Sequence, residues 1–130
     1  MYYSIIDAAS LNNPTLLNEL RQRKVIVKYE PESPSSAYHY NFLLEIDDND
    51  INGVIKKIQN TMKESWYTFF WNKTTLFITF NTKQFQINIA NGWSSDSYKS
   101  AQAFGRTQKI PEIYLDFKKY FQPYKENFEA

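Results

Sequence analysis

The chain has 130 residues, enough for one domain with its own core, and aromatic residues make up 18% of it. Its 15 basic and 14 acidic residues give a formal charge of +1, which argues against a strong, sequence-independent nucleic-acid binder. The absence of cysteine excludes disulfides and thiolate metal sites. Without a membrane-length apolar run or a signal-peptide pattern, we expect a cytoplasmic protein that does not bind membranes.

The first part of the chain predicts two strands on either side of a short helix, and then a third strand. Residues 2–8 indicate a strand, and residues 13–23 begin with asparagine and proline, as a short helix often does. Residues 24–30 and 38–46 alternate as strands do, so we expect an antiparallel pair. The segment 31–37 is rich in proline and serine, which predicts the loop between them.

A helix follows the acidic cluster of Asp47, Asp48 and Asp50. Acids before a first helical turn favour its positive dipole end, and we interpret them as capping residues. A calcium loop would need a fixed glycine and a distal glutamate that this segment lacks, so we expect no metal. The helical spacing is the clearest in the chain, with an apolar stripe at Ile51, Val54, Ile55, Ile58 and Met62.

Residues 66–89 predict a three-stranded meander rich in aromatic and β-branched residues. With two-residue turns at 72–73 and 81–82, Phe69 lies opposite Leu76, and Ile78 lies opposite Phe85. Side chains alternate along a strand, so one face gathers the apolar residues and should be a core face. It carries Tyr67, Phe69, Trp71, Leu76, Ile78, Phe80, Phe85, Ile87 and Ile89.

The other face of the meander carries Trp66, Phe70 and Phe77 among threonine, glutamine and asparagine, with no acid. Two interpretations are open. Another part of the chain could cover these aromatics, as it does for most large apolar patches of monomers. Alternatively they form a surface that binds a partner protein, a second copy of the chain or nucleic-acid bases.

Two more helical segments follow a turn at Asn91-Gly92. In the first, Ser94 is the predicted N-cap, Trp93 and Tyr98 can form a hydrophobic staple, and Gly105 is the predicted end. The second is a helical tail over 112–130, in which Pro123 should end or bend the helix. We expect the tail to cover part of the sheet with its aromatic stripe of Tyr114, Phe117, Phe121, Tyr124 and Phe128.

These elements predict a single α+β domain over residues 1–130. Its antiparallel sheet contains the meander in its C-terminal half, and helices pack on one face of the sheet.

The sequence offers little chemistry, and we expect a protein that is not an enzyme and holds no cofactor. His39 is the only histidine, and neither an orienting acid nor a pocket can be assigned to it. Glu45 and Asp47 share a strand face, but they lie at a strand end next to a helix start, as solvated residues do. The three glycines are too far apart in the sequence for a phosphate-binding loop.

The C-terminal half also contains a pattern of aromatic and turn residues. Trp66 and Phe69 precede a hairpin spanning Phe77 to Phe85, and Phe104-Gly105 is followed by Ile110-Pro111-Glu112 and Leu115-Asp116-Phe117. In this it resembles small uncharacterised proteins of low-GC bacteria that carry Gly-x-x-x-x-Ile-Pro-Glu-x-x-Leu-Asp-Phe near their ends. The resemblance covers roughly half of the chain, and it implies no activity and no site residues.

Three functional hypotheses follow, of which the third is an enzyme, which a convergent pocket containing His39 and a carboxylate would support. The first is a non-enzymatic interaction protein, such as an inhibitor, an immunity-type protein or a mobile-element accessory protein, which binds a protein or its own copy through Trp66, Phe70 and Phe77. The alternative is a single-stranded nucleic-acid-binding module that stacks bases on the same face. Its phosphate contacts would come from Lys73, Lys83 and Arg106.

Overall fold

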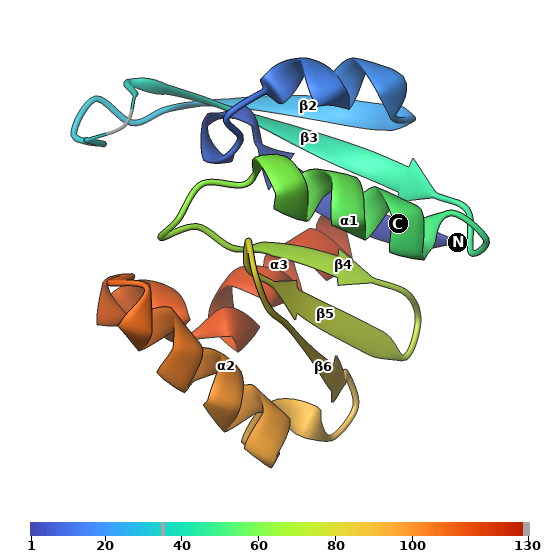
Figure 1. Cartoon of the computed structure of the whole chain (residues 1–130), viewed down its shortest axis with the longest axis vertical. Helices are drawn as coiled ribbons and strands as arrows, with labels where there is room; N and C mark the ends of the chain where they lie inside the picture. Colours follow the sequence, from blue (N-terminus) through green and yellow to red (C-terminus); the bar gives the residue numbers. More distant parts are fainter. Residues whose placement is uncertain (35, 129–130) are drawn as a thin grey trace.

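The computed structural model describes residues 1–34 and 36–128, and it contains one six-stranded antiparallel sheet (Figure 1). The strand order is β2-β3-β1-β4-β5-β6, so β1 and β4 form the middle and β2 and β6 the edges. The single α+β fold expected from the sequence is confirmed. The strands are β1 (Tyr2–Asp7), β2 (Gln22–Tyr29), β3 (Tyr38–Ile46), β4 (Thr68–Trp71), β5 (Thr75–Thr79) and β6 (Gln84–Asn88).

Helices cover both faces of the sheet, so the expectation that they pack on one face is wrong. Helix α1 (Ile51–Thr61) crosses in front of the sheet in Figure 1, whereas α3 (Phe117–Phe128) lies behind it. Helix α2 (Asp96–Thr107) packs on the same face as α3. Short 3-10 helices fill the connections: η1 (Ala8–Ser10), η2 (Pro14–Glu19), η3 (Gly92–Ser94) and η4 (Glu112–Leu115).

The predicted core face of the meander is confirmed, and it lies against α2 and α3. Trp71 and Phe69 are buried and meet the ring of Phe121 with centroid distances of 5.3 and 5.6 Å. These ring pairs approach edge to face, the arrangement that aromatic quadrupoles favour. Tyr98 and Phe117 complete the same cluster from the two helices.

The second core lies on the opposite face, beneath α1. Ile51, Ile55 and Ile58 of the predicted stripe are buried there. They pack in one cluster with Leu44 of β3 and Phe70 of β4. The middle of the sheet is therefore apolar on both sides, and each side needs its own helical cover.

The second hairpin of the meander has the predicted register, whereas the first is shifted by two residues. Phe69 lies opposite Ile78 rather than Leu76. The cause is Asn72, whose Oδ1 accepts the N–H groups of Thr74 and Thr75 at 3.0 and 2.9 Å, so the turn closes one residue later than expected. A shift of two keeps every side chain on its predicted face.

Three sequence predictions for the last two helices differ from the structure. The N-cap of α2 is Ser95 rather than Ser94, and its Oγ accepts the Tyr98 N–H at 3.2 Å. Gly105 does not end α2, which continues to Thr107. Pro123 lies inside α3 without ending it, because Phe117 and Phe121 hold the helix against the sheet.

Other predictions for the tail and the acidic cluster need correction or lie partly outside the description. Tyr114 is exposed on η4 and does not join the buried stripe; Phe128 lies at the end of α3 and its side chain is outside the described residues.

Asp50 precedes α1 but its side chain makes no cap hydrogen bond. Instead, Asp47 pairs with Arg21 at 2.9 Å, and Asp48 pairs with the chain's amino terminus.

Gly105 provides the close approach between α2 and η4. A Cβ at this position would lie 2.4 Å from Leu115 Cδ2, and Leu115 is itself buried. We expect Gly105→Ala to lower the free energy of unfolding by about 1–2 kcal/mol in urea denaturation, because overpacking exceeds the gain in helix propensity. Gly53→Ala in α1 is the matched control, since no atom lies within 4 Å of its Cβ and it should stabilise by up to about 1 kcal/mol. Equal effects of the two changes would contradict the packing role.

Candidate functional site

The three predicted partner-binding residues belong largely to the core beneath α1. Phe70 is fully buried, and Trp66 and Phe77 are half-buried against the same cluster. The chain itself covers this face through α1 rather than through the C-terminal tail, which lies on the other side. In the folded chain Phe70 can neither contact a partner nor stack a base, so the expected binding face is not an open surface.

The three cations of the nucleic-acid hypothesis do not converge. Lys73 and Lys83 lie in the turns at opposite ends of β5. Lys83 Nζ lies over the ring of Phe104 at 5.4 Å. Arg106 forms a double-donor ion pair with Glu112, and this contact lowers the pKa of the Glu112 carboxyl. These positions do not surround one base-stacking surface.

The open apolar surface lies instead on the hairpin of β2 and β3. Five of the eight large apolar side chains exposed among the described residues belong to it, with exposed fractions from 43% to 65%. They share one sheet face, because Val25, Val27 and Tyr29 lie opposite Phe42, Tyr40 and Tyr38. We call this the hairpin face; it consists of Val25, Val27, Tyr29, Tyr38 and Tyr40.

The hairpin face is open because the covering helices end before it. Leu44 and Phe42, farther along β3, pack into the core beneath α1 and η2. Beyond them the hairpin extends past the covering elements toward its loop, at the upper left of Figure 1. The rings of Tyr29 and Tyr38 pack on each other there, with centroids 5.1 Å apart.

Strand β2 is also an edge of the sheet, since β3 is its only neighbour. The Glu30 N–H donates to the Ala37 carbonyl at 2.6 Å, which identifies this pair as a hydrogen-bonded one. Because bonding alternates along an antiparallel pair, the N–H and C=O groups of Val25, Val27 and Tyr29 face away from β3. The edge thus presents three backbone donors and three acceptors beside an apolar face.

The charge on this edge has one sign. Arg23, Lys24 and Lys28 are exposed along β2, and the strand contains no acid. Arg23 Nε lies 3.6 Å from Glu45 Oε1 of β3, and Lys28 Nζ lies 6.0 Å from the ring centroid of Tyr124. A strand that pairs with β2 therefore meets a basic edge.

On the other face of the same hairpin, the structure supplies the acid that the sequence could not assign to His39. His39 Nδ1 lies 2.6 Å from Asp7 Oδ2, and His39 Nε2 lies 2.9 Å from Ser33 Oγ. The imidazole is buried, whereas Ser33 is half-buried in the loop 30–37. Thirty-two residues separate Asp7 from His39, so only the pairing of β1 with β3 brings them together.

The surroundings of His39 are acidic and aromatic. Glu30 Oε2 lies 3.6 Å from His39 Nε2, so two carboxylates flank the ring. Tyr124 of α3 lies near the same group: burial raises the pKa of its phenol, and the charges of Asp7 and Glu30 raise it further. The cluster thus lies where the loop end of the hairpin approaches Tyr124 of α3.

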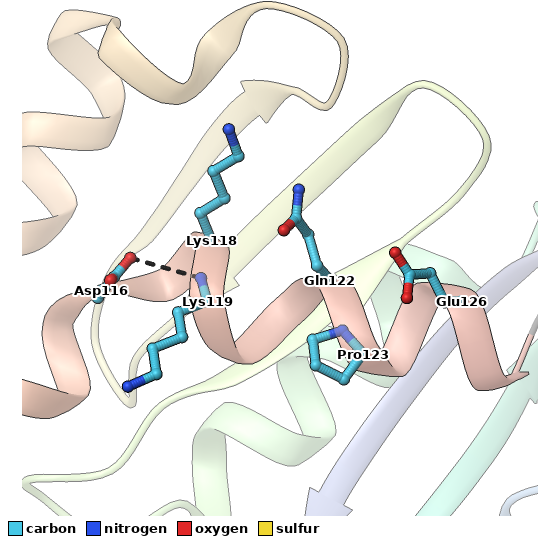
Figure 2. A pocket seen from close by; sticks show the side chains of 6 residues that line it. All are labelled: Asp116, Lys118, Lys119, Gln122, Pro123 and Glu126. Atoms are coloured by element: carbon cyan, nitrogen blue, oxygen red, sulfur yellow. Dashed lines mark hydrogen bonds between the residues drawn. The ribbon is translucent and has the colours of Figure 1, made fainter.

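A shallow pocket runs along α3, but its lining carries no convergent chemistry. Figure 2 shows that its side chains, among them Lys118, Lys119 and Glu126, all come from one short segment and point outward. Asp116 Oδ1 accepts the Lys119 N–H and so completes the first turn of the helix. No metal-ligand cluster and no helix able to cross a membrane occur among the described residues.

Comparison with known proteins gives no assignment: no protein-family model, no curated protein and no solved structure matches this chain. The candidate sites therefore rest on geometry alone. Sequence analysis missed both of them. The alternating residues of β2 and β3 predict strands, but they do not indicate which face of the hairpin stays exposed. Nothing in the sequence indicates that the Asp7 carboxylate contacts His39.

The difference in burial between the core beneath α1 and the hairpin face can be measured through protein stability. We expect Phe70→Ala to lower the free energy of unfolding by about 3–5 kcal/mol, because it leaves a cavity in the core beneath α1. Val27→Ala on the hairpin face should cost less than about 1 kcal/mol. Urea denaturation monitored by tryptophan fluorescence distinguishes the two. Comparable losses would mean that the hairpin face is covered in solution.

Proposed function

We propose that the chain is an interaction protein that binds another protein by accepting an extended acidic strand along the free edge of β2. The carrying observation is the coincidence of an unpaired edge, an open apolar face and a run of basic residues on one strand. Backbone bonds to the edge would supply affinity, and alternate side chains would supply specificity. The class expected from the sequence is kept, but the contact moves from the meander to the hairpin.

The charges on β2 match an acidic partner strand, and they oppose one register of pairing with a second copy of the chain. In an antiparallel pair of two β2 strands centred on Ile26, Lys24 of one copy would lie opposite Lys28 of the other. Like charges directly opposite each other destabilise such a pair. Lysines on an edge strand protect it from pairing with other copies and aggregating. An acidic partner strand would instead be attracted to these lysines.

The apolar face favours a partner strand with alternating residues. A strand added beside β2 continues the sheet, so every second side chain lies next to Val25, Val27 and Tyr29. Apolar residues at those positions would extend the hairpin face, and acidic residues between them would lie near Lys24 and Lys28. The expected ligand therefore alternates valine, isoleucine or tyrosine with glutamate or aspartate.

A synthetic ten-residue peptide with this alternation tests the proposal by fluorescence anisotropy. We expect saturable binding that weakens as salt is raised. A peptide of the same composition in separate acidic and apolar blocks, and a peptide with lysine in place of glutamate, should bind at least about tenfold more weakly, a difference of 1.4 kcal/mol.

Two changes isolate the backbone bonds. Val27→Pro removes an outward N–H while leaving the bonds to β3, and Val27→Thr is the control that keeps the donor. N-methylation of alternate peptide amides tests the same bonds without altering the protein. Val27→Pro and N-methylation of the peptide should each weaken binding at least about tenfold, whereas the control Val27→Thr should not. Binding that is indifferent to both changes would contradict strand addition.

A second copy of the chain or a nucleic acid bound at the β2 edge would give different results. A dimer in light scattering that dissociates in Val27→Pro would make a second copy the occupant and overturn the acidic strand. Binding of a single-stranded oligonucleotide with steep salt dependence, in the absence of peptide binding, would overturn it in favour of nucleic acid.

A further inference from the structure

We infer that Ser33 is a nucleophile activated by His39 and Asp7, and that small activated acyl esters acylate it. This inference concerns the opposite side of the hairpin from the proposed strand-binding edge and does not depend on it. It rests on the order and distances of three side chains from two strands and a loop, Asp7 to His39 at 2.6 Å and His39 to Ser33 at 2.9 Å.

The two nitrogens of His39 have different partners, and this difference makes the arrangement directional. In the tautomer with its proton on Nδ1, His39 donates to Asp7 Oδ2, and Nε2 accepts from the Ser33 hydroxyl. The other oxygen of Asp7, Oδ1, accepts the Ala9 N–H at 2.9 Å and fixes the carboxylate at the start of η1. An aligned acid, base and hydroxyl is the arrangement that activates serine for attack on a carbonyl.

The chemical step follows from these roles. The Ser33 Oγ forms a bond to the acyl carbon of the ester, and its proton moves to His39 Nε2. The bond between the acyl carbon and the leaving oxygen breaks, and the leaving alcohol takes the proton from Nε2. Asp7 and Glu30, with carboxylate oxygens 2.6 and 3.6 Å from the ring nitrogens, stabilise the imidazolium formed in between.

One feature of the loop limits the rate of this reaction. The Ser33 N–H donates to the Glu30 carbonyl at 3.0 Å, so it is not free to stabilise the oxyanion. An oxyanion-hole donor contributes a factor of about 10²–10³ to the rate. We therefore expect slow, stoichiometric acylation rather than rapid turnover.

The open surroundings of Ser33 define the class of ester. Pro31, Glu32 and Pro34, its described neighbours in the loop, are exposed and form no deep acyl pocket. A short acyl group with a good leaving group needs no such pocket. An acetyl ester of a nitrophenol matches this class.

The test is incubation of the full chain with p-nitrophenyl acetate, followed by intact mass spectrometry and peptide mapping. We expect one acetyl group on Ser33 in the wild type and none at that position in Ser33→Ala. Ser36→Ala, in the same loop, is the matched control, because the Ser36 Oγ accepts the Tyr38 N–H rather than contacting the ring, and it should keep the adduct. Labelling spread over lysines, with none on Ser33, would overturn the inference.

The roles of His39 and Asp7 are tested by the acylation rate. In His39→Gln the acylation rate should fall about a hundredfold and become proportional to hydroxide, because no side-chain base remains to take the Ser33 proton. Asp7→Asn keeps an oxygen for the Ala9 N–H, so slower acylation in a variant with an unchanged melting temperature identifies Asp7 as a positioning residue. Identical pH profiles of wild type and His39→Gln would show that the ring only supports the loop.

Discussion

The fold depends on a sheet whose middle strands are apolar on both faces. In β4, Phe69 and Trp71 point to one side and Phe70 to the other, and all three are buried. A sheet of this kind cannot leave either face in water, because each buried aromatic side chain contributes about 1.5–3 kcal/mol. This requirement explains why α1 lies on one face and α2 and α3 on the other.

Buried hydroxyls secure the middle of the sheet between the two cores. The Ser4 Oγ donates to the Phe69 carbonyl at 2.7 Å, and the Thr68 Oγ1 donates to the Ile5 carbonyl, so both link β1 to β4. Hydroxyls that are buried with a partner avoid the cost of an unpaired polar group. These two bonds add to the backbone ladder that pairs β1 with β4.

The two edge strands of the sheet, β6 and β2, differ in how far other elements cover them. At one end α2 packs beside β6, and the Ser97 Oγ donates to the Gln86 carbonyl at 2.8 Å. At the other end η2 contacts only the start of β2, where the Gln22 Nε2 donates to the Leu17 carbonyl at 2.8 Å, and Val25, Val27 and Tyr29 stay exposed. A strand that is long, apolar on one face and basic along its edge is the feature on which the proposed strand binding rests.

Sequence reasoning predicted the strands, α1 and the nine-residue core face, because these depend on local periodicity. It placed the aromatic side of the meander correctly but could not say what covers it, since coverage by α1 is a tertiary fact. The stripe of Ile51, Ile55 and Ile58 contained part of the answer: a helix with one apolar face must bury it, and that face matched Phe70. The contacts of His39 were beyond prediction, because they join segments that only strand pairing brings together.

Hydrogen exchange of individual backbone amides, followed by NMR on the isolated protein, tests the central claim most directly. Slow exchange is expected for Phe70 and Phe77 in the covered middle of the sheet. Within β2, exchange should alternate: Ile26 and Lys28 are protected by β3, whereas Val25, Val27 and Tyr29 exchange quickly at the open edge. Uniform protection along β2, or rapid exchange at Phe70, would contradict a sheet that is covered in its middle and open at this edge.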